Sequence, residues 1–345
     1  MIRVAINGFG RIGRNTFKAG FGRKDLKDIE WVAVNDLTSP DNLAYLLKHD
    51  SVYGNFEHEV SHGPTSPRLR GAGNDYLEVD GKKIAVFAEK DPTKLPWGKL
   101  KIDVVLECTG IFRDKAGAEM HLKAGAKKVI ISAPSKGSDI NTYVLGVNEE
   151  KYGKKEAIID NGSCTTNCIA PVAAIINKSF GIEKAMMTTI HAYTADQSLV
   201  DGPHKDMRRG RSAAQNMVPT TTGAAEAVAK TIPSLKGTFD GLAIRVPVIC
   251  GSIADFTFVL KKNTTVEEIN DAFRKAAATP AMKGILLASD EPLVSTDIIK
   301  NSYSAIVDLA NTKVVGGNLA KVLAWYDNEW GYSNRLVEMI KNIMK

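Results

Sequence analysis

The sequence has few cysteines and no long apolar run. Only four cysteines occur among 345 residues, and none forms a Cys-x-x-Cys pair. This pattern argues against a disulfide scaffold and indicates a reducing compartment. No apolar stretch reaches the roughly 20 residues that a membrane-spanning helix needs, and the first residues lack the features of a secretory signal peptide. We therefore expect a cytoplasmic protein without a membrane partner.

The charge pattern has no strong excess of one sign. Hydrophobic residues make up 44% and charged residues 24%, with a net charge of +6 that is spread along the chain. This composition suits about two folded domains with sizeable cores. Arginines form one tight cluster, at 208–211. It is compatible with nucleic-acid binding, but a phosphate clamp or a subunit contact explains three arginines equally well.

The first half of the chain alternates short β-branched runs with helical patterns, which predicts a parallel sheet covered by helices. The expected strands are residues 2–6, 31–34, 104–106, 129–131 and 158–159, and the expected helices are 17–26 and 116–124. Residues 77–86 predict a hairpin, because Asp80-Gly81 separates two alternating runs. Residues 62–74 are rich in Gly, Pro and Ser and predict an exposed loop.

The second half is rich in strand patterns and predicts a largely antiparallel sheet. The expected strands are residues 187–193, 242–248, 255–260, 304–309 and 319–326. A capping box at Thr265 and Glu268 begins a helix that ends near Ala277. Apolar residues at helical spacing near the C-terminus predict a last helix that docks on the first domain.

The expected fold class is therefore α/β, with two domains. Residues 1–163 form a Rossmann-type domain with a doubly wound parallel sheet, completed by a helix at 328–345. Residues 164–327 form an α+β catalytic domain with a largely antiparallel sheet.

A glycine motif follows the first predicted strand. Gly8, Gly10 and Gly13 form G-x-G-x-x-G between a strand and a helix, the context that indicates a dinucleotide site. Gly8 permits the tight turn, Gly10 lets the backbone approach a pyrophosphate, and Gly13 lets helix and strand pack closely. Asp36 ends the next strand, at the spacing of a carboxylate that binds the adenosine ribose and favours NAD over NADP.

Cys164 lies just after the last predicted strand of the first domain. A thiol needs a lowered pKa to act as a nucleophile, and a helix N-terminus or an imidazole can supply it. A helix from Thr165 would place the sulfur at its positive end, although Pro171 predicts a short first turn or a kink. Cys168 is a poor zinc ligand without further ligands nearby, so we assign it to the core and expect no metal.

Six histidines are candidate bases for this thiol: His49, His58, His62, His121, His191 and His204. His191 is favoured because it lies on a predicted strand of the second domain among small and hydroxylated residues. Any single histidine is more often structural than catalytic, so the sequence alone gives His191 no more than a preference.

Several segments resemble one family, phosphorylating glyceraldehyde-3-phosphate dehydrogenase of glycolysis. The matching segments span nearly the whole chain: residues 7–14, 163–168, 191–194, 222–225, 245–247 and 325–335. The resemblance implies that glyceraldehyde 3-phosphate is oxidised with NAD and inorganic phosphate to 1,3-bisphosphoglycerate, through a hemithioacetal and a thioester on Cys164. His191 would be the base.

The same resemblance implies further site residues and an assembly. The substrate and phosphate residues would be Ser163, Thr165, Thr194, Arg209, Thr222, Gly223 and Arg245. The cofactor residues would be Gly8, Gly10, Arg11, Ile12, Gly13, Asp36, Lys90, Thr109, Gly110, Ser132 and Asn328, the last binding the nicotinamide carboxamide. A homotetramer is implied by the long loop of residues 193–217.

Two alternatives remain open at this point. Erythrose-4-phosphate dehydrogenase would use the same thiol and cofactor, with a longer sugar and with water as the acyl acceptor. A nucleic-acid-binding or surface-binding module would use the basic character, but the scattered charge argues against it as the primary role.

Overall fold

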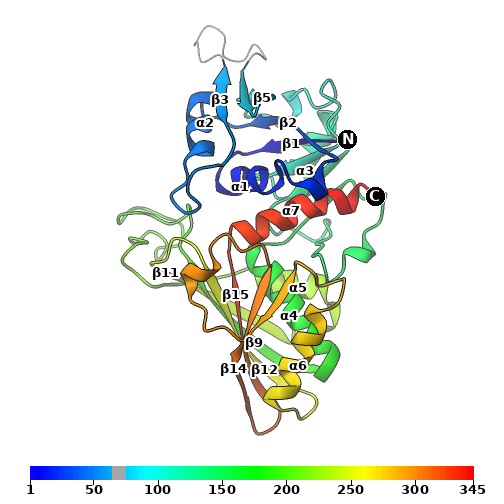
Figure 1. Ribbon diagram of the computed structural model, residues 1–345, viewed down its shortest axis with the longest axis vertical. Coiled ribbons are helices and arrows are strands. Elements are labelled where there is room, and N and C mark those ends of the chain that lie inside the picture. Colours follow the sequence, from blue (N-terminus) through cyan, green and yellow to red (C-terminus); the bar gives the residue numbers. More distant parts are fainter. Residues whose placement is uncertain (64–74) are drawn as a thin grey trace. The chain divides into compact units, whose positions relative to one another are not determined.

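The computed structural model describes residues 1–63 and 75–345, and these divide into two compact units (Figure 1). Unit 1 comprises Met1–Thr142, Lys151–Asn161 and Ser333–Lys345. Unit 2 comprises Tyr143–Glu150 and Gly162–Tyr332. The chain thus enters unit 2 once before Gly162, a crossing that the sequence did not indicate.

Unit 1 contains an eight-stranded sheet in the order β3-β4-β5-β2-β1-β6-β7-β8. Its strands are β1 (Ile2–Asn7), β2 (Ile29–Asn35), β3 (Val60–Gly63), β4 (Tyr76–Val79), β5 (Lys82–Phe87), β6 (Val104–Glu107), β7 (Lys128–Ile131) and β8 (Ile158–Asp160). All neighbours from β5 to β8 are parallel, which confirms the predicted parallel sheet. The middle strands are buried on both faces, so they read as continuous apolar runs.

The helices of unit 1 are α1 (Arg11–Gly20), α2 (Pro40–Lys48), α3 (Lys115–Lys123) and most of α7 (Trp330–Ile343). They differ from prediction at two places, since α2 was not expected and the helix at 17–26 was misplaced. The expected helix at 17–26 is wrong, because α1 begins at the glycine motif and ends at Gly20. Gly22 has a φ of +75°, a left-handed conformation that stops the helix, and only a short 3-10 turn follows at Lys24–Leu26.

The predicted hairpin is confirmed. β4 and β5 pair antiparallel, and both Asp80 and Gly81 have positive φ, at 48° and 77°, as a two-residue hairpin turn requires. The expected loop at 62–74 is wrong at its start, because His62 and Gly63 pair with β4 as the end of β3. The remainder of that expected loop, residues 64–74, lies outside the described residues.

Unit 2 contains a seven-stranded sheet in the order β10-β11-β9-β12-β15-β14-β13. Its strands are β9 (Ile182–Ala192), β10 (Val218–Thr220), β11 (Phe239–Val246), β12 (Ser252–Leu260), β13 (Leu286–Ser289), β14 (Ala305–Val315) and β15 (Leu319–Tyr326). Four of the six neighbouring pairs are antiparallel, and β9–β11 and β13–β14 are parallel, so the largely antiparallel prediction is confirmed.

The helices of unit 2 are α4 (Cys164–Phe180), α5 (Ala224–Thr231) and α6 (Val266–Ala277). The capping box that starts α6 is present, since Thr265 and Glu268 bond each other's backbone amides. The helix expected from Thr165 is present as α4, which runs through Pro171 without a separate first turn. Burial on both sides of Pro171, from Cys168 to Ala173, stabilises the helix against the loss of one hydrogen bond.

Candidate active site

The glycine motif forms a tight turn between β1 and α1. Gly8 has a φ of +90°, and a Cβ atom there would lie 2.7 Å from the Thr109 nitrogen. A Cβ atom on Gly13 would lie 2.2 Å from the Gly8 oxygen, so only glycine allows this approach of helix and strand. A Cβ atom on Gly10 would meet nothing within 4 Å, and Gly10 provides no side-chain cap for α1. The turn therefore leaves open space and free amides for a phosphate group.

A cavity of about 560 Å³ lies at this turn, at the carboxyl ends of β1, β2 and β6. Its position, where the strand order reverses around β1, is typical of nucleotide sites in parallel sheets. Among the expected cofactor residues, five line it: Gly8, Gly10, Asp36, Lys90 and Thr109.

The other expected cofactor residues lie elsewhere. Arg11, Ile12 and Gly13 belong to α1, and the side chain of Arg11 forms an ion pair at 2.9 Å with the buried Asp50, which the sequence did not suggest. Gly110 and Ser132 follow β6 and β7. Asn328 belongs to unit 2.

The carboxylate of Asp36 is held by two backbone amides at the cavity. One oxygen accepts a hydrogen bond from the Phe9 N–H at 2.8 Å, and the other accepts one from the Thr38 N–H at 3.0 Å. Each carboxylate oxygen has a second lone pair, so the group is oriented and still able to accept hydroxyl donors.

A buried polar network that the sequence did not reveal supports the cavity. The Glu107 carboxylate accepts hydrogen bonds from the Asn7 side chain at 2.6 Å, the Thr109 amide at 2.8 Å and the Thr109 hydroxyl. It also contacts Nε2 of His121 at 3.0 Å, while the Trp97 N–H lies 3.1 Å from Nδ1. The Trp97 donor assigns the lone pair to Nδ1 and the proton to Nε2. Two of these residues, Asn7 and Thr109, line the cavity.

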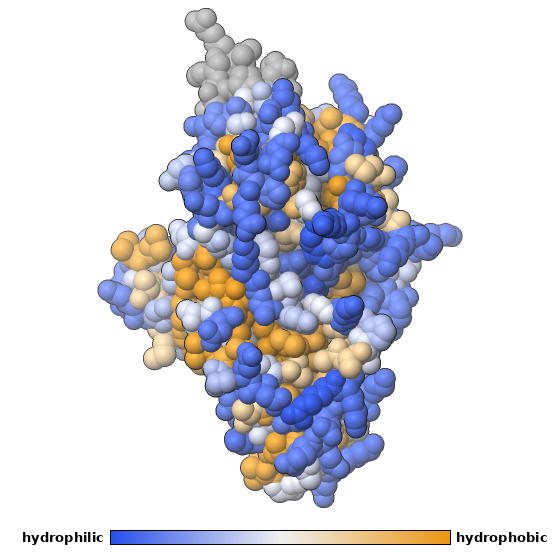
Figure 2. All heavy atoms as spheres, viewed as in Figure 1, coloured by the Kyte–Doolittle hydropathy of each residue, from blue (hydrophilic) through white to orange (hydrophobic). Residues whose placement is uncertain are grey.

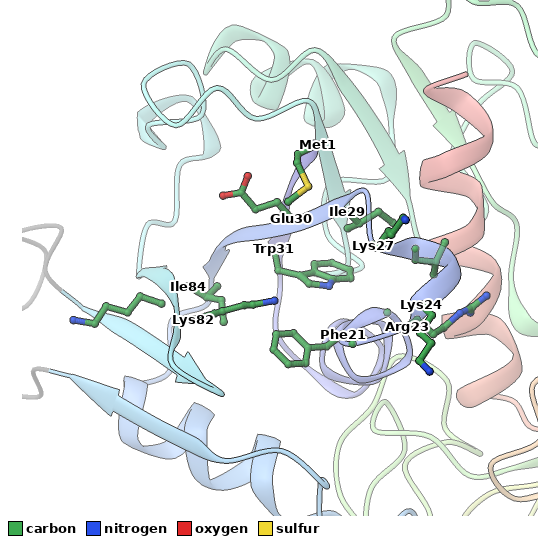
Figure 3. Close-up of a pocket in the computed structure, with 14 residues that line it drawn as sticks. Met1, Phe21, Arg23, Lys24, Lys27, Ile29, Glu30, Trp31, Lys82 and Ile84 are labelled. Atoms are coloured by element: carbon green, nitrogen blue, oxygen red, sulfur yellow. The ribbon is translucent and has the colours of Figure 1, made fainter.

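A second cavity of unit 1, of about 870 Å³, contains none of the expected site residues. Figure 3 shows the rings of Phe21 and Trp31 beside the side chain of Lys82 in this cavity. No sequence motif indicated this cavity.

The thiol and imidazole meet within unit 2. Cys164 is the first residue of α4, where the Ser163 hydroxyl accepts a hydrogen bond from the Thr166 N–H. Its Sγ atom lies 3.5 Å from Nε2 of His191, near the end of β9. Cys164 is partly exposed, whereas His191 is 3% exposed. Of the six histidines, His191 is the one in contact with this thiol.

The strand register places an arginine beside this histidine. β9 and β11 are parallel, and Arg245 is the register partner of His191. The Arg245 Nη1 atom lies 2.8 Å from Nδ1 of His191, 3.1 Å from the Ala192 oxygen and 3.2 Å from the Thr194 hydroxyl. Nδ1 itself lies 2.6 Å from the Ala192 oxygen. A proton on Nδ1 donates to that carbonyl and leaves the Nε2 lone pair toward sulfur.

The electrostatics of the pair correct the expectation of a lowered thiol pKa. Burial raises the pKa of the Cys164 thiol, although the Arg245 charge and the Thr165 hydroxyl oppose the rise. Burial, together with the charge of Arg245, lowers the pKa of His191 to about 3. The protein without ligands therefore holds a neutral thiol beside a neutral imidazole, because desolvation outweighs the favourable contacts. A neutral imidazole can accept a proton from the thiol.

Several expected phosphate residues form one cluster. Arg245 contacts the Thr194 hydroxyl, and Thr194 donates a hydrogen bond to Asp196. Arg209 forms an ion pair with Asp196 at 2.6 Å and donates to the Thr220 hydroxyl at 2.9 Å. The aspartate between the two arginines was not expected from the sequence. Its pKa is lowered by the Thr194 hydrogen bond and the Arg209 charge despite the opposing effect of burial.

The remaining expected phosphate residues lie at helix starts. Ser163 caps α4 and Thr165 is its second residue. Gly223 is the N-cap residue of α5, and the Thr222 hydroxyl accepts a hydrogen bond from the Ala224 N–H at 3.2 Å. Both starts present backbone amides, which suit an anion.

Tyr326 adds a buried hydroxyl that the sequence did not suggest as a site residue. Its OH lies 2.9 Å from the Thr165 hydroxyl and 2.8 Å from the Thr189 hydroxyl. Its ring meets the His191 ring edge to face, with centroids 5.9 Å apart. Tyr326 therefore packs against both the imidazole and the residue that follows the thiol.

No helix in the described part of the chain is long and apolar enough to cross a lipid bilayer. Within the same residues, no group of three or more His, Cys, Asp or Glu side chains is arranged to hold a metal ion.

The cavity at the glycine turn and the thiol–imidazole pair suit an NAD-dependent oxidoreductase that acts on an aldehyde group, and matches to known proteins show this class. Residues 2–115 match the family model described as the glyceraldehyde 3-phosphate dehydrogenase NAD binding domain. Residues 163–328 match the C-terminal domain of the same family. The chain belongs to the glyceraldehyde-3-phosphate dehydrogenase family, and its cofactor is NAD.

Curated relatives extend the match over nearly the whole chain. Glyceraldehyde-3-phosphate dehydrogenase 2 of Streptomyces avermitilis is 51% identical over 339 residues, 98% of this chain and 97% of the relative. Glyceraldehyde-3-phosphate dehydrogenase of Geobacillus stearothermophilus is 52% identical over 339 residues, with the same two shares. The chloroplastic GAPB enzyme of Arabidopsis thaliana is 52% identical over 340 residues, 98% of this chain and 74% of the relative.

Proposed function

We propose that this protein oxidises glyceraldehyde 3-phosphate with NAD and inorganic phosphate to 1,3-bisphosphoglycerate, as a glycolytic enzyme of the cytoplasm. The observation that carries the proposal is the 3.5 Å contact between the Cys164 sulfur and Nε2 of His191. The relatives named glyceraldehyde-3-phosphate dehydrogenase, several of them bacterial, support the substrate.

The first steps form a covalent bond to Cys164. Nε2 of His191 takes the thiol proton as sulfur attacks the aldehyde carbon, and that proton then passes to the aldehyde oxygen to give a hemithioacetal. The 3.5 Å contact supports this transfer. The backbone N–H of Cys164, at the start of α4, and the imidazole stabilise the charge that develops on oxygen.

The oxidation leaves a thioester on Cys164. His191 accepts the hemithioacetal hydroxyl proton as the hydride departs. NAD, when bound, would supply the acceptor for that hydride. Inorganic phosphate then attacks the thioester carbon, the C–S bond breaks, and the product leaves as an acyl phosphate. The thiolate recovers a proton from His191.

The substrate phosphate and the inorganic phosphate bind to arginine side chains and to the N-termini of helices in unit 2. Arg245, Thr194 and Arg209 form one positively charged cluster around Asp196. Ser163, Thr165, Thr222 and Gly223 provide hydroxyls and amides at the starts of α4 and α5. Guanidinium groups and amides are suited to phosphate dianions.

The pyrophosphate of NAD binds at Gly8, Gly10 and the first turn of α1, where Arg11, Ile12 and Gly13 begin the helix. Asp36 accepts the ribose hydroxyls and repels a 2′-phosphate. Lys90, Thr109, Gly110 and Ser132 complete the cofactor contacts on unit 1. Asn328 binds the nicotinamide carboxamide.

The protein assembles as a homotetramer. Large apolar side chains of unit 2 are exposed in the single chain, and Figure 2 shows broad orange areas on this unit's surface. Four of them lie within the long loop of residues 193–217 and are at least 75% exposed: Leu199, Val200, Met207 and Met217. Exposed apolar side chains in such numbers are typical of surfaces that bind another subunit.

The test is NADH formation from glyceraldehyde 3-phosphate with and without inorganic phosphate. We expect turnover to depend on phosphate. Turnover that ignores added phosphate would contradict the proposal and point to water as the acyl acceptor, and erythrose 4-phosphate should then be the better substrate. An absence of NADH with either sugar would remove the assignment altogether.

A further inference from the structure

We propose that Ser252 is a positioning residue that links the side-chain amide of Asn328 to the catalytic imidazole. The proposal rests on the proposed function for the roles of Asn328 and His191. All the contacts that carry it lie within unit 2.

The Ser252 hydroxyl lies between two partners at the start of β12. Its Oγ atom is 2.9 Å from Oδ1 of Asn328 and 3.1 Å from the Ala192 nitrogen. A hydroxyl carries one proton, so it donates to the Asn328 oxygen and accepts the Ala192 N–H. Ser252 is 1% exposed and Ala192 is fully buried, so water does not replace either bond.

Two donors fix the orientation of the Asn328 amide. Oδ1 accepts hydrogen bonds from the Ser252 hydroxyl and from the Gly251 N–H at 3.1 Å. Gly251 has a φ of +91°, and a Cβ atom there would lie 2.4 Å from the Ser295 oxygen, so the backbone that supplies this donor requires glycine. With Oδ1 engaged, and no described residue bonded to Nδ2, the NH₂ group is the donor that is left for a ligand.

The other partner of Ser252 is the residue that bonds the imidazole. Ser252 accepts a hydrogen bond from the Ala192 N–H, and the oxygen of Ala192, which belongs to the next peptide group, accepts the Nδ1 proton of His191 at 2.6 Å. That bond opposes the alternative in which Nδ1 accepts from Arg245, whose Nη1 atom lies 2.8 Å away. In the alternative, the proton moves to Nε2, and the imidazole then presents a donor to the Cys164 sulfur instead of a lone pair.

One hydroxyl therefore orients two groups at once. It turns the Asn328 NH₂ group toward a carboxamide oxygen and keeps the Nε2 lone pair of His191 toward the Cys164 sulfur. Loss of this hydroxyl leaves the Ala192 N–H without its partner and frees the Asn328 amide to rotate.

The experiment compares Ser252→Ala, Ser252→Thr and a matched control, Ser289→Ala, in the full-length enzyme. Ser289 is a buried serine in β13 of the same sheet, and its hydroxyl bonds only the Glu291 N–H among the described residues. Two measurements need no turnover: the dissociation constants of NAD and of ADP-ribose, which lacks nicotinamide, and the rate of Cys164 alkylation by iodoacetamide in the cofactor-free protein.

We expect Ser252→Ala to weaken NAD binding by about tenfold, equal to about 1.4 kcal/mol, and to leave ADP-ribose binding unchanged. Alkylation of Cys164 should slow because the sulfur loses its proton acceptor. Ser252→Thr should restore both properties at least in part, and Ser289→Ala should resemble the wild type.

Equal losses for NAD and ADP-ribose, or unchanged NAD affinity, would overturn the proposal, as would unchanged alkylation. The binding and alkylation measurements on the variants do not depend on the result of the NADH assay, which is carried out on the wild-type protein. Failure of the proposed function and failure of the Ser252 inference can therefore be told apart.

Discussion

The Nη1 atom of Arg245 lies 2.8 Å from Nδ1 of His191, so a permanent cation is held against the imidazole. Strand pairing causes this contact, because the two residues are register partners on the parallel strands β9 and β11. The arginine lowers the pKa of the imidazole in the same direction as burial does. Both effects therefore keep the base of this site neutral near pH 7.

The lowered pKa of His191 predicts a dependence of stability on pH. The pKa is 6.5 for an ordinary histidine and about 3 in the folded protein. Between these values the unfolded chain binds a proton that the folded protein does not, so stability falls as pH decreases. We expect this residue to remove about 2 kcal/mol between pH 7 and pH 5.

The measurement is urea unfolding of wild type and His191→Asn at both pH values. The variant lacks the titrating group, so it should lose less stability than the wild type. Parallel losses in the two proteins would show that His191 is protonated as easily in the folded state as in the unfolded chain.

Asp36 controls the choice of cofactor. We expect Asp36→Gly to raise the affinity for NADP relative to NAD by at least about tenfold, because it removes the charge that repels a 2′-phosphate. Asp36→Asn is the matched variant, since it keeps an oxygen for the Phe9 or Thr38 amide and removes the charge. Calorimetric titration with both cofactors measures the ratio, and a ratio equal to that of the wild type in both variants would refute this role.

Glu107 forms hydrogen bonds with two residues that line the cofactor cavity, Asn7 and Thr109. Glu107→Leu leaves the amide and hydroxyl of Thr109 and the side chains of Asn7 and His121 without their acceptor. We expect a loss of about 3 kcal/mol of stability and weaker NAD binding, because buried polar groups are costly when unpaired. Thermal unfolding and NAD titration measure the two effects.

The control for this variant is Glu267→Gln, which changes an exposed carboxylate at the start of α6. It should leave both properties unchanged. A Glu107→Leu protein as stable as this control would mean that the network does not stabilise the cavity.

The sequence predicted the features that depend on local order. Buried strands such as β1 and β6 read as apolar runs, and the glycine motif encodes its own turn through the φ of Gly8 and the close approach at Gly13. The hairpin at Asp80 and Gly81 and the capping box of α6 are equally local. These elements need no knowledge of distant residues, which explains why they were foreseen.

Contacts that depend on strand pairing could not be predicted from the sequence. The pairing of Arg245 with His191 depends on the register of two strands that are far apart in the chain, and Ser252 reaches Asn328 from 76 residues away. The pKa of the Cys164 thiol is raised instead of lowered for a similar reason. A helix start and an imidazole can be read from residue order, whereas the burial that outweighs them emerges only when the chain is packed.

The most direct test is mass spectrometry of protein quenched during glyceraldehyde 3-phosphate oxidation without added phosphate. The account predicts a phosphoglyceroyl adduct on Cys164, absent from Cys164→Ser although that variant still binds NAD. NADH formation by wild type with no acyl group at this residue, or substantial turnover by Cys164→Ser, would contradict it.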